Sequence, residues 1–89
     1  MAAFHVAAVD LGATSGRVMS ARVAPDTLQM VESARFPNGP VERADGLHWD
    51  IEALRTAVLA GLTRALREDS AIASIGIDSW AVDYALFRG

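Results

Sequence analysis

The fold of this chain is decided by the stretch Val9-Asp10-Leu11-Gly12-Ala13-Thr14-Ser15-Gly16-Arg17. A nearly continuous apolar run from Phe4 to Val9 precedes the acidic residue, and a run this short is typical of a strand buried on both faces. The glycines and hydroxyl residues that follow are turn-forming types. From Arg17 to Val23 the sequence predicts a second strand, which folds back on the first as a hairpin.

A third strand and a helix are expected next. Pro25 and Asp26 form a turn before a strand from Leu28 to Phe36, and a polar loop then runs from Pro37 to Gly46. Asp50 stands where a helix N-cap belongs, and the helix is expected to end near Asp69-Ser70. Apolar residues recur within it at spacings of three and four, which predicts one core-facing stripe: Ile51, Leu54, Val58, Leu62 and Leu66.

The end of the chain predicts two more strands. Residues Ile72 to Ile77 form a second short apolar run ending at Asp78, and Val82 to Phe87 follow after an interruption at Ser79-Trp80-Ala81. Short turns make the first three strands antiparallel, whereas a helical crossover makes the fourth strand parallel to one of them. The order strand-strand-strand-helix-strand-strand predicts an α/β chain with a mixed sheet. It is the opening of a ribonuclease-H-like fold, the fold of actin/hexokinase-type ATPases.

Composition narrows the class of protein. The 89 residues include 8 basic and 11 acidic residues, no cysteine, and no basic stripe of the kind that binds nucleic acid. No apolar run approaches the roughly 20 residues that span a bilayer, and no secretion signal is visible, so a cytoplasmic protein without a membrane partner is expected. A chain this small and apolar, without a disulfide or a metal site, is also expected to be part of a larger protein.

The hairpin has the chemistry of a phosphate site. Backbone amides of a glycine-rich turn converge on anions, Thr14 and Ser15 add hydroxyl donors, and the Arg17 guanidinium suits phosphate. Asp10 would repel phosphate, so its natural role is to hold magnesium or the water bound to magnesium. The residues alone leave a second interpretation open, because glycine-rich hairpins are common and an aspartate at a strand end often caps a turn.

Three segments resemble a known family. Residues 10–17 resemble the first phosphate motif of the FGGY carbohydrate kinases. Arg35-Phe36-Pro37-Asn38-Gly39 followed by Gly46-Leu47-His48-Trp49-Asp50 is similar to the loop-to-helix passage of the rhamnulokinase subfamily. Residues 74–84 resemble the subfamily segment that usually reads Asp-Thr-Trp-Gly-Val-Asp. The three resemblances occur in the right order and cover nearly the whole chain, so together they are far more specific than any one of them.

The resemblance implies a function and a set of site residues. The family transfers the γ-phosphoryl group of ATP to a sugar, here L-rhamnulose, to give the 1-phosphate. Asp10 would lie near Mg²⁺, and residues 1–89 would be the amino-terminal part of the first kinase domain, without the second domain. The ATP phosphates would be bound by Ala13, Thr14, Ser15, Gly16 and Arg17. The ketose pocket would be lined by Trp80, Ala81 and Asp83.

The same resemblance sets limits. The family's catalytic base is an aspartate farther along the chain, so residues 1–89 are expected to be inactive without the missing carboxy-terminal part of the enzyme. The family has glycine where this chain has Ala81, which leaves the identity of the sugar less certain than the family. Structural roles remain open for several polar and aromatic residues: packing for Trp80 and Trp49, and turn capping for Asp78 and Asp83.

Two other functions stay open at this stage. One is a non-catalytic nucleotide-binding or interaction module that is complete at this length and pairs its exposed sheet edge with another chain. The other is a fragment of an actin-like or chaperone-like ATPase, which shares the phosphate hairpin but does not explain the turn at Trp80-Ala81-Val82-Asp83.

Overall fold

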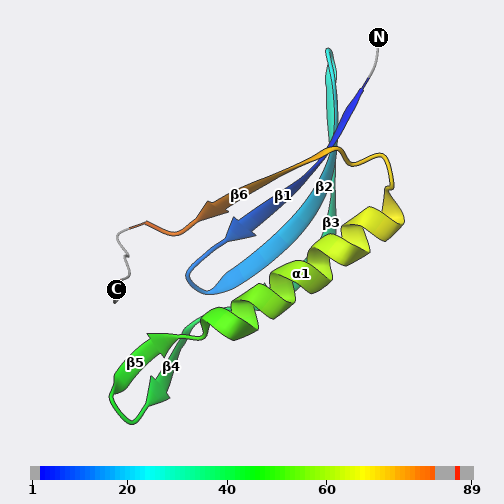
Figure 1. The fold of residues 1–89 in the computed structure, drawn as a ribbon. Helices are drawn as coiled ribbons and strands as arrows, with labels where there is room; N and C mark the ends of the chain where they lie inside the picture. The colour runs from blue at the N-terminus through cyan, green and yellow to red at the C-terminus, as the bar shows by residue number, and fades with distance from the viewer. Residues whose placement is uncertain (1–2, 82–85, 87–89) are drawn as a thin grey trace.

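A computed structural model describes residues 3–81 and residue 86. A four-stranded mixed sheet forms its centre (Figure 1). Strands β1 (Phe4–Leu11) and β2 (Ser15–Ala24) are antiparallel, as are β2 and β3 (Thr27–Pro37), whereas β1 and β6 (Ser74–Ser79) are parallel. This confirms the predicted hairpin and the predicted helical crossover. In spatial order the strands are β3, β2, β1 and β6.

The polar loop predicted between Pro37 and Gly46 is wrong. Strands β4 (Pro40–Arg43) and β5 (Gly46–Trp49) form a separate antiparallel hairpin there. Its turn is closed by Gly46, whose φ of 127° lies in a region that favours glycine. The hairpin is small and mostly exposed on both faces, so its residues lack the apolar alternation that marks a strand. The described element order is therefore five strands, one helix and one strand.

The last predicted strand is not tested. Apart from Leu86, its residues Val82 to Phe87 lie outside the described part of the chain. The α/β class and the mixed sheet are present in the described residues, whereas the ribonuclease-H-like order remains a prediction.

Helix α1 (Ile51–Glu68) begins and ends where the sequence predicts. The Asp50 carboxylate accepts a hydrogen bond from the Ala53 backbone N–H at 3.0 Å, which satisfies one of the free amides of the first turn. At the other end the Asp69 backbone N–H donates to the Ala65 carbonyl at 2.8 Å. Among residues 3–81 and 86, no helix has the length and apolar composition needed to cross a membrane.

Asp50→Ala is expected to lower the free energy of unfolding by about 1 kcal/mol, because the first turn loses its cap. The change should appear as faster hydrogen exchange at the Ala53 amide. Glu42→Ala, which removes an exposed carboxylate from β4, is the matched control. Equal exchange rates in the two variants would contradict this role for Asp50.

Helix α1 lies across one face of the sheet, over β1, β2 and β3 (Figure 1). Val9 and Val18 of the sheet and Ala65 of the helix form the centre of the core. The predicted apolar stripe is only partly correct. Ile51 and Leu66 stay 62% and 42% exposed, whereas the members that pack into the core are Leu54, Val58 and Leu62.

The contact between helix and sheet is made through small residues. Gly61 and Ala65 are buried on α1 together with Leu54. A Cβ atom placed on Gly61 would lie 2.6 Å from Val18 Cγ2 and 3.2 Å from Ala34 Cβ. The helix backbone therefore comes so close to β2 and β3 that no side chain fits between them. This close approach moves the buried face of the helix away from Ile51 and Leu66.

The helix end is also tied to β1. His5 Nδ1 and Asp69 Oδ2 lie 2.6 Å apart, and the Ala73 backbone N–H donates to the His5 carbonyl at 2.9 Å. The hydrogen bond with His5 lowers the pKa of Asp69. These contacts fix the start of β6 beside β1.

Candidate functional site

The turn between β1 and β2 is the predicted phosphate hairpin, defined here as residues Asp10 to Arg17. The Gly12 backbone N–H donates to the Ser15 carbonyl at 2.9 Å. A Cβ atom on Gly12 would lie 2.8 Å from the same carbonyl oxygen. Glycine is therefore required for the turn to close. Ala13 and Thr14 form its exposed tip.

Asn38, the residue that follows β3, is hydrogen-bonded to this hairpin. The Asn38 backbone N–H donates to the Thr14 carbonyl at 3.0 Å, and Asn38 Nδ2 donates to the Gly12 carbonyl at 2.8 Å. In the sequence, Asn38 belongs to the predicted polar loop and to the segment that resembles the family's loop-to-helix passage, and neither assigns it a contact with the turn. The register of β2 against β3, which pairs Ser15 with Pro37, is what brings it to the turn. A local pattern contains no such register, so the sequence did not indicate these two hydrogen bonds.

Asp10 and Arg17 form an ion pair across the hairpin. The β1–β2 register places them opposite each other, and Arg17 Nη2 donates to Asp10 Oδ2 at 2.7 Å. The hydrogen bond and the charge of Asp10 raise the pKa of Arg17. The two side chains are 49% and 41% exposed for Asp10 and Arg17, so both remain accessible to a ligand.

The five residues predicted to bind ATP form one continuous segment, with Ala13 and Thr14 in the turn and the other three at the start of β2. Gly16 is buried, and a Cβ atom there would overlap the Phe36 ring. The structure therefore gives Gly16 a packing role. Ser15 and Arg17 flank it on β2.

A second acidic residue lies beside Asp10. The parallel register of β1 and β6 pairs Asp10 with Asp78, and Asp78 Oδ1 accepts the Ser79 backbone N–H at 2.9 Å. The turn-capping role left open for Asp78 is thus present. Within residues 3–81 and 86 no cluster of three or more metal-binding side chains occurs. Mg²⁺ is usually held by one or two carboxylates together with substrate phosphates, so the metal role predicted for Asp10 needs no larger cluster.

Trp80 follows β6 at the same edge of the sheet. Since β1 and β6 are parallel and Leu11 pairs with Ser79, the hairpin and Trp80 leave the sheet side by side. Ligand sites of open α/β sheets commonly lie at this carboxyl-terminal edge of parallel strands. Ala81 is exposed next to Trp80. Asp83, the third residue predicted to contact the sugar, lies outside the described residues.

Trp49 is brought against Trp80, which the sequence did not predict. Their ring centroids are 4.5 Å apart and their planes are tilted by 43°. The contact joins the β4–β5 hairpin to the segment after β6. Trp49 therefore has the packing role expected of it, with Trp80 as its neighbour.

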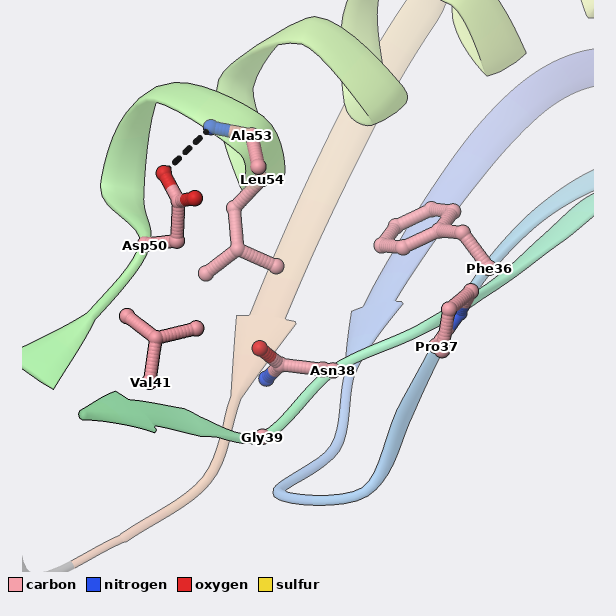
Figure 2. Close-up of a pocket in the computed structure, with 8 residues that line it drawn as sticks. All are labelled: Phe36, Pro37, Asn38, Gly39, Val41, Asp50, Ala53 and Leu54. Atoms are coloured by element: carbon pink, nitrogen blue, oxygen red, sulfur yellow. Dashed lines mark hydrogen bonds between the residues drawn. The ribbon is translucent and has the colours of Figure 1, made fainter.

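Two hollows lie close to the phosphate hairpin. An apolar groove of about 370 Å³ lies between α1 and β6, and its lining includes Leu11, Leu54, Ile77 and Trp80. A cavity of about 250 Å³ lies between the start of α1 and the end of β3. Figure 2 shows this cavity, with Asn38 among the residues that line it.

The chain is similar in sequence to known proteins. It is 46% identical over 84 residues to a rhamnulokinase of Enterobacter sp. (strain 638). It is 44% identical over 79 residues to a rhamnulokinase of Bacteroides thetaiotaomicron. The alignments cover 92% and 89% of this chain. The chain is rhamnulokinase-like in sequence.

This rhamnulokinase-like segment spans only 17% and 16% of the length of these two relatives. Such coverage is consistent with an amino-terminal fragment of a longer enzyme. No protein-family model matches the chain.

Proposed function

We propose that this chain is the amino-terminal part of an ATP-dependent carbohydrate kinase of the FGGY family, which phosphorylates L-rhamnulose to L-rhamnulose 1-phosphate in the cytoplasm. The observation that carries the proposal is the phosphate hairpin, in which Asp10 and Arg17 face each other directly beside the glycine-rich turn. The similarity to rhamnulokinases over most of the chain supports the choice of sugar.

In this proposal the hairpin binds the phosphates of ATP. Ala13 and Thr14 supply backbone N–H donors at the exposed tip, Ser15 and Thr14 supply hydroxyls, and Arg17 supplies a positive charge. Gly16 allows β2 to pack against Phe36. Asp10 would hold Mg²⁺, and the ion would supply positive charge beside the phosphates.

The Asp10–Arg17 pair is suited to exchange with that ligand. A carboxylate and a guanidinium at 2.7 Å neutralise each other while both stay about half exposed. Mg²⁺ would take the place of Arg17 beside Asp10, and phosphate would take the place of Asp10 beside Arg17. Each charge then keeps an opposite charge next to it, so binding leaves neither group unpaired.

The sugar is proposed to bind at the same edge of the sheet, against Trp80, Ala81 and Asp83. The nearness of Trp80 to the hairpin supports this placement, because the phosphoryl donor and its acceptor must meet. An alanine methyl in place of the family glycine narrows the pocket, and one such group is worth about 1–3 kcal/mol of discrimination between sugars.

The rest of the kinase is needed for the reaction. Phosphoryl transfer depends mostly on positioning and on electrostatic stabilisation, and the catalytic base and the second domain are proposed to come from sequence beyond residues 1–89. In a ribonuclease-H-like kinase the described sheet is part of the first domain.

Residues 1–89 alone are expected to transfer no phosphoryl group, whereas a full-length hybrid should do so. In this hybrid kinase, residues 1–89 replace the segment that they match in the Enterobacter rhamnulokinase. Release of ADP with L-rhamnulose as acceptor is the measurement. Turnover by residues 1–89 alone would contradict the proposal, and a hybrid that binds ATP without any turnover would favour a non-catalytic nucleotide-binding module.

A further inference from the structure

One residue of the β3–β4 connection binds both ends of the hairpin turn. Asn38 donates from its backbone to the Thr14 carbonyl and from its side chain to the Gly12 carbonyl. Asn38 is half-buried, and it stands between Pro37 and Gly39 at the border of the cavity in Figure 2. The two hydrogen bonds therefore set the orientation of the turn from outside the hairpin itself.

These two hydrogen bonds also fix the direction of the next N–H groups. In a trans peptide the carbonyl of one residue and the N–H of the next point in opposite directions, and the described peptide bonds are trans. Because the Gly12 carbonyl points towards Asn38, the Ala13 N–H points away from it. Because the Thr14 carbonyl also points towards Asn38, the Ser15 N–H points away from Asn38.

This orientation of the peptide groups favours an anion on the side of the turn opposite Asn38. Carbonyl oxygens carry partial negative charge and would repel phosphate, but those of Gly12 and Thr14 are held by Asn38. Backbone N–H groups carry partial positive charge and form anion-binding hollows in turns. Within residues 3–81 and 86, the Ala13 N–H has no hydrogen-bond partner.

We propose that Asn38 is a positioning residue for the nucleotide phosphates. Its side-chain amide orients the peptide group between Gly12 and Ala13, so that the Ala13 N–H is directed at the phosphate and the Gly12 carbonyl is not. Asn38 itself does not touch the nucleotide. The inference rests on the proposed function of the hairpin as the site for the ATP phosphates.

The first test needs no nucleotide. Asn38→Ala in the hybrid kinase should speed hydrogen exchange in the peptide that covers residues 10–16 by about 3- to 10-fold, the factor that corresponds to one neutral hydrogen bond. Gln29→Ala, which removes an exposed amide side chain from the other end of β3, is the matched control and should leave that peptide unchanged. Unchanged exchange in Asn38→Ala would overturn the proposal.

The second test is the dissociation constant of Mg²⁺–ATP, measured by calorimetry. Asn38→Ala should raise it by about 3- to 10-fold. Asn38→Asp should raise it further, because the new carboxylate cannot donate to Gly12 and repels the phosphates, and added salt should reduce that excess. The dissociation constant for L-rhamnulose should not change in either variant.

The outcomes separate the two proposals. Faster exchange at the hairpin with an unchanged dissociation constant for ATP would mean that Asn38 is only structural, and this would overturn the inference. Failure of the unsubstituted hybrid kinase to bind ATP would instead contradict the proposed function of the hairpin, on which the Asn38 inference rests.

Discussion

Asp10→Asn in the hybrid kinase is expected to lower kcat/KM for Mg²⁺–ATP by at least about 100-fold, the range found when one electrostatic group of an active site is removed. The proposed reason is that the amide cannot hold Mg²⁺ as a carboxylate does. The substitution also removes the charge that faces Arg17 at 2.7 Å in the hairpin. The rate of ADP release should be measured over a range of Mg²⁺ concentrations, where the variant is expected to need more metal.

The control for Asp10→Asn is Asp26→Asn, which makes the same chemical change in the exposed turn between β2 and β3. It should leave kcat/KM unchanged. If the Asp10 variant kept its kcat/KM within about threefold, a difference of less than 1 kcal/mol, Asp10 would be a structural partner of Arg17 and the metal role would be wrong.

Gly61→Val is expected to lower the free energy of unfolding by about 3 kcal/mol, at the upper end for overpacking in a core. Glycine is normally about 1 kcal/mol worse than alanine within a helix. At position 61, however, glycine is required, because a Cβ atom would lie 2.6 Å from Val18 Cγ2, and Val18 is fully buried. Helix α1 would have to move away from β2, and the core around Val9 would open.

Pulse proteolysis of the hybrid kinase in urea measures this change, with the cleavage products mapped to residues 1–89. Ala60→Val is the matched control, since it places the same β-branched side chain at the neighbouring exposed position of the helix. The Ala60→Val substitution should lower the free energy of unfolding by only about 0.5 kcal/mol, because valine has a lower helix propensity than alanine. Equal stability of the Gly61 and Ala60 variants would show that the helix does not depend on the close contact.

The elements that the sequence predicted correctly are those with local causes. The apolar run before Asp10, the turn residues after it and the N-cap at Asp50 all act over a few residues, so they can be seen in the sequence. The β4–β5 hairpin was missed because it is mostly exposed and carries no apolar alternation. The helix stripe was partly wrong because periodicity gives the apolar face but not the point of closest approach to the sheet.

In the candidate site, too, the residues with local causes were predicted and the long-range contacts were not. Gly12, Arg17 and Asp10 were identified from sequence because they lie in one continuous segment. The opposition of Asp10 and Arg17 also follows from the hairpin, once its register is known. The hydrogen bonds of Asn38 join residues 24 and 26 positions apart, so they exist only through the pairing of β3 with β2.

The sequence by itself determined the strand-turn-strand at Asp10, the helix limits and the resemblance to sugar kinases, because each depends on neighbours along the chain. Tertiary structure alone decided that Asn38 orients the hairpin, that Trp49 packs on Trp80 and that Gly61 sets the distance from helix to sheet. These contacts depend on strand register and on the packing of backbone against side chain. Both are fixed by long-range pairing, which no local pattern contains.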